Sequence, residues 1–342
     1  MSMAEPFLGL SLDDRRDALA AAPGRGLERA PALLEKDVWV VWCLQALFAA
    51  PFGEHLVFKG GTSLSKAYDV IERFSEDVDL TYDIRALVED ESAGDPADLT
   101  KAQVNALSKD IRKTLLPQLL DEVIAPYLTA QLATEGLTAR VEREGSDLLL
   151  YYEAAVDYPD YVRPRIKLEF GARSTGEPAE TRPVTCYMAA AFLELAFPEA
   201  TPRVMWPART FWEKATAVHV FCLAGHFRGR AGFARHWYDL LRLEAAGHAD
   251  EAMADRDLAK AVADHKAKFF VEKAANGAVI DYHVAVGGGL KLVAEGEAYD
   301  LLAADYAAMV EAGYLDGEDE AFADLMARCR ALEARVNAEM TT

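Results

Sequence analysis

The spacing of hydrophobic residues predicts helices and strands in the first part of the chain and mainly helices in the second. Residues 31–53 are mostly apolar between an acidic first turn and a Pro-Gly end, a pattern typical of a mostly buried helix. Residues 101–135 also have helical spacing. Because proline interrupts helical hydrogen bonding, Pro117 and Pro126 are expected to divide this second helical region.

Alternation of apolar and polar residues predicts strands after this region. Two strands are expected within 137–156, joined at Gly145, and a third within 163–173. The residues beyond Trp206 return to helical spacing. The helices expected there span 210–223, 235–245, 257–275, 296–311 and 318–338.

This order of elements predicts an α/β (α+β) fold in two lobes. Residues 1–205 would form an N-terminal lobe in which helices flank a mixed β-sheet, and residues 206–342 would form a helical C-terminal lobe. A chain of 342 residues is long enough for two moderate cores.

Composition argues against several classes of protein. The formal net charge is −20, so a broad phosphate-neutralising surface is not expected, and any contact with nucleic acid must be local. The four cysteines lie far apart without a CxxC pair, which indicates neither a disulfide framework nor a zinc site. The longest apolar run, residues 38–50, is too short to span a bilayer, and no signal-peptide pattern opens the chain. We therefore expect a cytoplasmic protein that makes no use of a membrane.

The sequence VFKGGTSLSKAYDVIERFSEDVDLTYD places two glycines directly before a helical pattern. Backbone N–H groups at a helix start are free to bind phosphate, and Gly60 and Gly61 would let the phosphate approach closely. Thr62 or Ser63 is expected to cap a helix that runs through SLSKAYDVIE. This is not a Walker loop, since no Gly-Lys-Ser/Thr follows the glycines. The alternative is an ordinary glycine turn before a capped helix.

The same stretch continues into an alternating acidic pattern. In EDVDLTYD, Val78 and Leu80 alternate with aspartates, which predicts a strand with one apolar and one acidic face. The carboxylates of Asp77 and Asp79 would point the same way and repel each other unless cations neutralise them. Mg²⁺ prefers such oxygen ligands together with substrate phosphates. The alternative is a solvated edge strand that its charge protects from aggregation.

Together, these two features meet the needs of nucleotidyl transfer, in which a triphosphate is held in line and two metal ions stabilise the attacking and leaving oxygens. The chain resembles the polymerase-β-like nucleotidyltransferases in their Gly-Gly-Ser/Thr and Asp-x-Asp signature. More narrowly, it resembles the AbiEii/AbiGii abortive-infection toxins from about Glu35 to near Met309. The resemblance lies in the order and spacing of five segments, EKDVWVVWCLQALF, FKGGTSLSKAYDVIERFSEDVDL, RIKLEFGAR, RTFWEKATAVH and RHWYDLLRL.

This resemblance implies a nucleotidyltransferase-type sheet in the first lobe and a toxin that moves a nucleotide from an NTP to an acceptor. The tRNA 3′ end is the acceptor that some relatives imply, and a neutralising antitoxin encoded nearby is an expected partner. Mg²⁺ or Mn²⁺ would be the cofactor, held by Asp77 and Asp79. The residues expected to bind the nucleotide are Lys59, Gly60, Gly61, Thr62, Ser63, Lys66 and Ser75.

A third carboxylate is expected from a neighbouring strand, because polymerase-β-like sites commonly use one. Glu169 lies on the polar face of RIKLEF and is assigned as an auxiliary metal ligand or as a residue that supports the ligands. The alternative is a salt bridge with a basic residue on the same face, such as Lys167.

Lys214 interrupts an otherwise apolar helix, FWEKATAVHVFCLAG, at a position where the toxins carry a functionally important lysine. Its ammonium would hold the triphosphate and offset charge at the transferring phosphorus. The alternatives are a surface lysine that extends to solvent and a partner of Glu213.

Asp239 occupies the YDL segment, where the toxins carry an active-site aspartate. It would orient Lys214 or help to deprotonate the acceptor hydroxyl. The alternative is an exposed salt-bridge ladder with Arg235 and Arg242, which share its helical face.

The segment FRGRAGFARH concentrates arginines without an acidic residue, which is unusual in so acidic a chain. Arg228, Arg230 and Arg235 are expected to bind an RNA end or a triphosphate tail, and a solvated loop explains them equally well.

Several functions are compatible with these residues. The first is a toxin-type nucleotidyltransferase with an RNA acceptor and a two-metal mechanism. The second keeps the site and takes a small acceptor or a kinase-like phosphoryl transfer. The third is an inactive fold that only binds a partner in a toxin–antitoxin complex.

Overall fold

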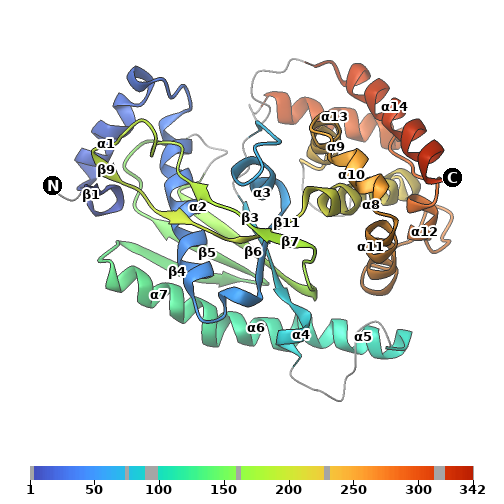
Figure 1. The fold of residues 1–342 in the computed structure, drawn as a ribbon, viewed down its shortest axis with the longest axis horizontal. Helices are drawn as coiled ribbons and strands as arrows, with labels where there is room; N and C mark the ends of the chain where they lie inside the picture. The colour runs from blue at the N-terminus through green and yellow to red at the C-terminus, as the bar shows by residue number, and fades with distance from the viewer. Residues whose placement is uncertain are drawn as a thin grey trace. The chain divides into compact units, whose positions relative to one another are not determined.

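The computed structural model describes residues 4–73, 77–88, 99–158, 163–226, 232–311 and 320–341, and the chain divides into two compact units (Figure 1). The first unit comprises Met1–Ala67, Ser75–Gly94 and Ala106–Met205. The second comprises Tyr68–Phe74, Asp95–Asn105 and Trp206–Thr342. Two short segments that precede residue 205 are thus grouped with the second unit.

The first unit is built on a seven-stranded mixed β-sheet, which confirms the α/β class (Figure 1). Its strand order is β4-β5-β6-β3-β2-β11-β7. The β3/β6 and β2/β11 pairs are parallel, and the other pairs are antiparallel. The strands of this sheet are β2 (Leu56–Lys59), β3 (Asp77–Asp83), β4 (Ala139–Glu144), β5 (Asp147–Tyr152), β6 (Arg165–Ser174), β7 (Ala179–Thr181) and β11 (Arg203–Met205). Two further pairs of short strands are β1 (Glu5–Pro6) with β9 (Leu195–Ala196) and β8 (Val184–Thr185) with β10 (Glu199–Ala200).

The strands follow the alternation in the sequence. The hairpin expected within 137–156 is confirmed as β4 and β5, and Gly145 in their turn has a φ of 66°, which glycine adopts without strain. In β3, Val78 and Leu80 are buried, whereas Asp77 and Asp79 are half-buried. The acidic face of this strand is therefore the more open one.

Helix α2 is the mostly buried helix that the sequence predicts. It spans Pro31–Ala49, and Trp39 stacks on Tyr152 of β5 with ring centroids 4.9 Å apart. Its buried Glu35 accepts a hydrogen bond from the backbone N–H of Ala155 at 2.9 Å. The other helices that begin before residue 205 are α1 (Leu12–Ala21), α3 (Gly60–Lys66), α4 (Ile84–Leu87), α5 (Lys101–Asp110), α6 (Leu116–Leu119) and α7 (Ala125–Thr134).

The two prolines do not divide the helical region as expected. Helices α5, α6 and α7 follow one another through π-helical turns at Ile111–Leu115 and Leu120–Ile124, and the residues at these junctions keep right-handed helical angles. Each proline lies at the second position of the α-helical piece that follows such a turn. A π-turn shifts the hydrogen bonding, so the missing proline N–H and its ring are accommodated without a break.

Helix α3 is shorter than the sequence predicts. It ends at Lys66, and Asp69 has a φ of 55°, so the chain leaves the helix before residues 67–72 of the stretch SLSKAYDVIE. The expected caps are also wrong, since no side chain caps this helix and the hydroxyls of Thr62 and Ser63 bind carbonyl oxygens instead. The glycines themselves are the first residues of the helix.

The second unit is helical, as its sequence period predicts. Its helices are α8 (Pro207–Ala224), α9 (Arg235–Ala245), α10 (His248–Ala254), α11 (Arg256–Phe269), α12 (Tyr282–Val286), α13 (Glu297–Glu311) and α14 (Phe322–Met340). Of these, α10 and α12 were not expected. Helix α8 contacts α9, α10, α11 and α12, and the indole N–H of Trp212 in α8 donates to the carbonyl of Ala252 in α10 at 2.9 Å. No helix within the described ranges is both long and apolar enough to cross a membrane.

Candidate functional site

The predicted site residues form two groups, one in each unit. The first group surrounds the turn from β2 into α3. Gly60 has a φ of 78°, and a Cβ atom at this position would overlap the carboxylate of Asp79 on β3. Only glycine adopts this φ without strain and has no Cβ atom to meet the carboxylate. The glycine turn and the Asp-x-Asp strand are therefore packed directly against each other.

Register places the charged residues of this group in rows across the sheet. Asp79 lies opposite Lys59 on β2 and opposite Glu169 on β6, and Asp77 lies opposite Lys167. Residues that face each other on neighbouring strands direct their side chains to the same side of the sheet. The acidic face of β3 is therefore shared by lysines and by a third carboxylate, as the sequence indicates.

Hydrogen bonds tie α3 to β3. The Thr62 hydroxyl donates to the carbonyl oxygen of Asp77, and the Ser63 hydroxyl donates to the carbonyl of Gly60 at 2.9 Å. These two hydroxyls hold the backbone around the glycines and the first aspartate in place. Their direct contact with a nucleotide remains a prediction.

Lys66 is engaged within the first unit. Its ammonium lies 2.5 Å from the carboxylate of Asp37 on α2 and 3.6 Å from the ring centroid of Tyr187, and its side chain is only 5% exposed. An ammonium held in this way stabilises the packing of α3 on α2. The predicted role of Lys66 in nucleotide binding would require it to leave this pair.

Glu169 has a basic partner on its own strand. Its carboxylate is hydrogen-bonded to Lys167, whose ammonium also lies 3.1 Å from Asp147 on β5. The salt bridge considered as the alternative is thus present, and a metal-supporting role stays a prediction. Among the residues that the structure describes, no three His, Cys, Asp or Glu side chains are placed to hold a metal ion.

The second group lies in the helical unit and centres on Asp239 of α9. Lys214 on α8 places its ammonium 2.7 Å from Oδ2 of Asp239. Arg73 binds the same carboxylate twice, from Nε to Oδ1 at 2.7 Å and from Nη2 to Oδ2 at 2.8 Å. The side-chain exposures are 0% for Asp239, 4% for Arg73 and 9% for Lys214, so this is a buried cluster of three charged groups.

The electrostatics of the cluster are dominated by the carboxylate of Asp239, which faces two cations. Burial raises the pKa of Asp239, but Arg73 and Lys214 outweigh that effect and hold it well below its usual range. Burial lowers the pKa of Lys214 against the attraction of Asp239. Two buried cations thus share the Asp239 carboxylate.

This geometry rules out the simpler interpretations of both residues. Asp239 is not part of an exposed ladder, since it is fully buried and Arg242 pairs instead with Glu72 at 3.0 Å. Lys214 is neither a surface lysine nor the partner of Glu213, which pairs with Arg209 at 3.1 Å. Two roles were considered for Asp239, and the contact with Lys214 matches the one in which Asp239 orients that lysine.

Arg73 is the residue that the sequence analysis missed. It stands in ERFSED, four positions before Asp77, and nothing in its local pattern indicates burial. The chain segment around it is grouped with the second unit, where Tyr68 packs edge-on against His248 and Glu72 pairs with Arg242. The one available signal was its position inside the segment FKGGTSLSKAYDVIERFSEDVDL, which already held several predicted site residues.

Three predicted site residues add little to this picture. Ser75, Arg228 and Arg230 lie outside the described residues. Arg235 is the first residue of α9 and is exposed, one turn before Asp239.

Comparison with known proteins identifies a matching family and similar solved structures. A family model described as "Nucleotidyl transferase AbiEii toxin, Type IV TA system" matches residues 42–328. Among solved structures, the nucleotidyltransferase toxin MenT4 from Mycobacterium tuberculosis H37Rv is similar at 18% identity and a TM-score of 0.40, over 98% of this chain and 100% of that one. No curated protein matches the sequence. The range matched by the family model contains both groups of candidate residues.

Proposed function

Because the chain belongs to the AbiEii family of nucleotidyl transferase toxins of type IV toxin–antitoxin systems, we propose that it transfers a nucleotide from an NTP to the 3′ end of tRNA and thereby arrests growth. Family membership makes the protein an NTP-using nucleotidyltransferase and implies an antitoxin partner. The RNA acceptor, the growth arrest, the action in phage defence and the cytoplasmic location belong to the proposal.

The observation that carries the proposal is the packing of Gly60 on Asp79. A glycine turn that leads into a helix offers backbone N–H groups to phosphate, and here that turn lies against the second aspartate of the Asp-x-Asp strand. A phosphate bound at the glycines would therefore lie close to a carboxylate, an arrangement that favours a bridging cation. An ordinary glycine turn has no need of this contact.

The donor set fits a divalent cation. Asp77 and Asp79 are half-buried, lie on one face of β3 and are oxygen donors, which Mg²⁺ prefers together with phosphate oxygens. When bound, Mg²⁺ or Mn²⁺ would neutralise charge on the reacting phosphates, as in a two-metal mechanism. The protein's own part is to hold both carboxylates on β3, whose first residue is tied to α3 by the Thr62 hydroxyl.

In this proposal Lys214 binds the triphosphate and Asp239 orients it. The Lys214 ammonium is a donor for a phosphate oxygen, and the triphosphate is the anion that the reaction supplies. Because the pKa of Asp239 is held low by its cations, its carboxylate is a weak base. Deprotonation of the acceptor hydroxyl is therefore not assigned to Asp239.

Incubation with total tRNA and each α-³²P-labelled NTP tests the reaction, because only nucleotidyl transfer leaves the α-phosphate on RNA. We expect label on tRNA with at least one NTP and its loss in the Asp77→Asn variant. Asp147→Asn is the matched control, an aspartate on the same sheet that pairs with Lys167. If α-label never reaches RNA while γ-label moves to RNA or protein, the reaction is a kinase-like phosphoryl transfer and the proposal fails.

A further inference from the structure

The sheet face that carries Asp77 and Asp79 continues from β3 over β6, β5 and β4. In one row of this face Asp79 lies opposite Glu169 on β6, and in the next row Asp77 lies opposite Lys167. Because side chains two residues apart on a strand point to the same side, a third row follows on the same face. We call this third row the arginine–tyrosine row, and its members, which lie directly opposite one another, are Arg165 of β6, Tyr151 of β5 and Arg140 of β4.

The arginine–tyrosine row lies on the side of the sheet away from α2. Helix α2 packs on the other side, where Trp39 stacks on Tyr152, and neighbouring residues of a strand point to opposite sides. Tyr151 and Arg165 are half-exposed, and the side chain of Arg140 is 66% exposed. A ligand can therefore reach all three residues of the row.

The three side chains of the row contact one another. The guanidinium carbon of Arg140 lies 4.5 Å from the ring centroid of Tyr151, and Nη1 of Arg165 donates to the Tyr151 hydroxyl at 3.4 Å. Arg140 also donates from Nε to the Glu142 carboxylate at 2.8 Å, in a pair whose side chains are 66% and 52% exposed. Because so exposed a pair contributes less than about 1 kcal/mol, a phosphate can take the place of Glu142. The row thus presents an aromatic ring between two cations.

The groups in this row define the chemistry of the ligand. Single-stranded RNA is recognised by bases that stack on aromatic rings and on guanidinium planes. Arginine also binds phosphate oxygens through two parallel hydrogen bonds. An isolated phosphate would use the arginines alone, whereas a nucleotide chain uses the ring as well. In a chain with a net charge of −20, a local basic surface of this kind is what contact with nucleic acid requires.

We propose that the arginine–tyrosine row binds the single-stranded end of the acceptor RNA, which rests on the proposed function in that it requires an RNA acceptor. The strand order β5-β6-β3-β2 places the row and the glycine turn on opposite sides of β3, because the turn follows β2 (Figure 1). Along β6, the row lies two residues, or roughly 7 Å, from the row that contains Asp77. An NTP at the glycines and an RNA end at the arginine–tyrosine row would thus approach the same two carboxylates from two sides.

The test is binding of a fluorescein-labelled single-stranded RNA octanucleotide that contains all four bases, measured by fluorescence anisotropy on the full chain. Tyr151→Ala should weaken binding by at least about fivefold, the lower range for one stacked base. Tyr151→Phe keeps the ring and should bind within about twofold of the wild type. Unchanged binding in a folded Tyr151→Ala protein, or no binding by the wild type, would overturn the proposal.

The two arginines give a second readout that does not depend on the ring. Replacing Arg140 and Arg165 together by Gln should reduce the slope of log affinity against log salt by about 1.4, because each phosphate contact on a single strand contributes about 0.7. Arg143→Gln is the matched control for Arg140→Gln. It removes the same charge from the same strand but from the other face, where Arg143 pairs with Asp121 at 2.6 Å. Equal slopes for these two single variants would show that RNA does not bind this face, and the proposal would fail.

Calorimetry with each NTP separates the acceptor from the incoming nucleotide. Tyr151→Ala should leave NTP affinity within about twofold, because the triphosphate is expected at the glycines beyond β2. If NTP affinity falls while RNA affinity stays unchanged, the row binds the incoming nucleotide and the acceptor assignment is refuted.

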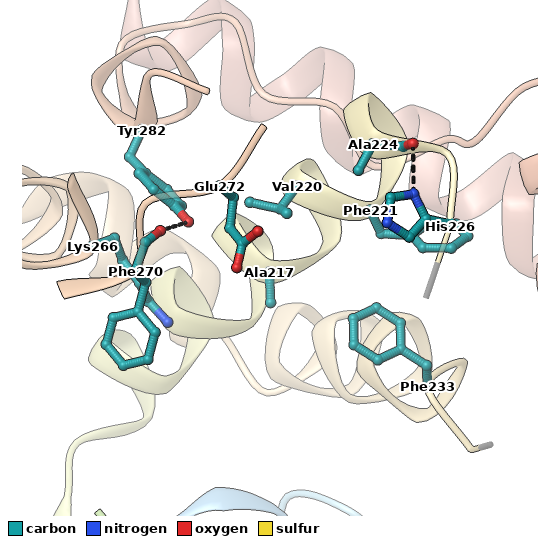
Figure 2. Close-up of a pocket in the computed structure, with 10 residues that line it drawn as sticks. All are labelled: Ala217, Val220, Phe221, Ala224, His226, Phe233, Lys266, Phe270, Glu272 and Tyr282. Carbon is teal, nitrogen blue, oxygen red and sulfur yellow. Dashed lines mark hydrogen bonds between the residues drawn. The ribbon is translucent and has the colours of Figure 1, made fainter. Parts of the chain in front are cut away.

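A cavity in the helical unit provides a comparison site, since it also has aromatic walls. It is partly open, has a volume of about 160 Å³, and is lined by Ala217 of α8 and by the rings of Phe221, Phe233 and Phe270 (Figure 2). Ala217→Phe adds a ring to this lining and should leave RNA affinity within about twofold. If Ala217→Phe weakens RNA binding and Tyr151→Ala does not, the base stacks in the helical unit and the proposal is overturned.

These outcomes are distinct from failure of the proposed function. If α-label reaches tRNA but RNA binding does not respond to changes in the row, transfer stands and the assignment of the row fails. If no NTP labels tRNA while RNA binding depends on Tyr151 and the two arginines, the row binds RNA and the proposed transfer fails.

Discussion

Replacing Asp239 by Asn should destabilise the helical unit more than replacing Arg73 by Met. In the folded protein one carboxylate faces two buried cations. Asp239→Asn removes the carboxylate that Arg73 and Lys214 share, and removal of one partner of a buried pair costs about 3–5 kcal/mol. Arg73→Met leaves the Lys214–Asp239 pair in place, and loss of the hydrogen bonds from Arg73 to the charged carboxylate costs about 1.5–3 kcal/mol.

Urea denaturation followed by tryptophan fluorescence measures this difference. Arg242→Met is the matched control, because Arg242 also pairs with the segment around Arg73 but through Glu72, which is 66% exposed. An exposed pair of this kind contributes less than about 1 kcal/mol. If Arg73→Met costs as much as Asp239→Asn, the carboxylate that the two cations share does not govern the stability of the cluster, and the reasoning is refuted.

The pH dependence of the same variants has a definite sign. The pKa of Asp239 is lower in the folded protein than its unfolded value of about 3.9. Its carboxylate therefore contributes stability that is fully present above about pH 4 and is lost as the pH falls toward the folded pKa. Asp239→Asn lacks this contribution, so the stability gap between wild type and variant should narrow below about pH 4. A gap that stays constant down to pH 2 would contradict the pKa direction.

Three further predictions concern the reaction. Gly60→Ala should lower α-label transfer by at least about 100-fold, because its Cβ would displace the Asp79 carboxylate, whereas Gly145→Ala, at a similar φ with open space around it, should retain activity. Asp79→Asn should abolish transfer yet leave the melting temperature unchanged or higher, since like-charge repulsion is removed, and full activity in this variant would exclude the metal role. Neutralising Arg228 and Arg230 together should reduce the slope of RNA affinity against log salt by about one to two, measured by filter binding, and an unchanged slope would place the RNA contacts elsewhere.

Local pattern was sufficient to predict the longer strands and most of the longer helices. Alternation around Gly145 defines a hairpin and the apolar run of α2 defines a buried helix, because burial on one face leaves a period in the sequence. The same reasoning failed at Pro117, where π-helical turns absorb the proline, and at the end of α3, where Asp69 takes a positive φ. The π-helical turns and the positive φ are backbone adjustments, and the spacing of apolar side chains does not indicate them.

The candidate site was only partly accessible from sequence. Gly60 and Asp79 are close in the chain, so the sequence alone was enough to predict that they belong to one site. Their contact follows from the pairing of β2 with β3. Arg73 could not be identified, because its carboxylate partner lies 166 positions away and burial of an arginine has no local signature. Pairing between residues so far apart in the sequence depends on the tertiary fold, and the local sequence pattern does not indicate it.

The segment from Tyr68 to Arg73 limits how this protein can be divided. It lies in the sequence between the glycines and the aspartates of the first unit. Its Glu72 and Arg73 side chains nevertheless pair with α9 of the second unit. A fragment cut at residue 205 would keep Arg73 and lose Asp239. The segment between the glycines and the aspartates would then lack its partners in the helical unit. We therefore expect that the two units cannot be exchanged independently between relatives. A chimaera should be active only when the segment Tyr68–Arg73 and the helical unit come from the same parent.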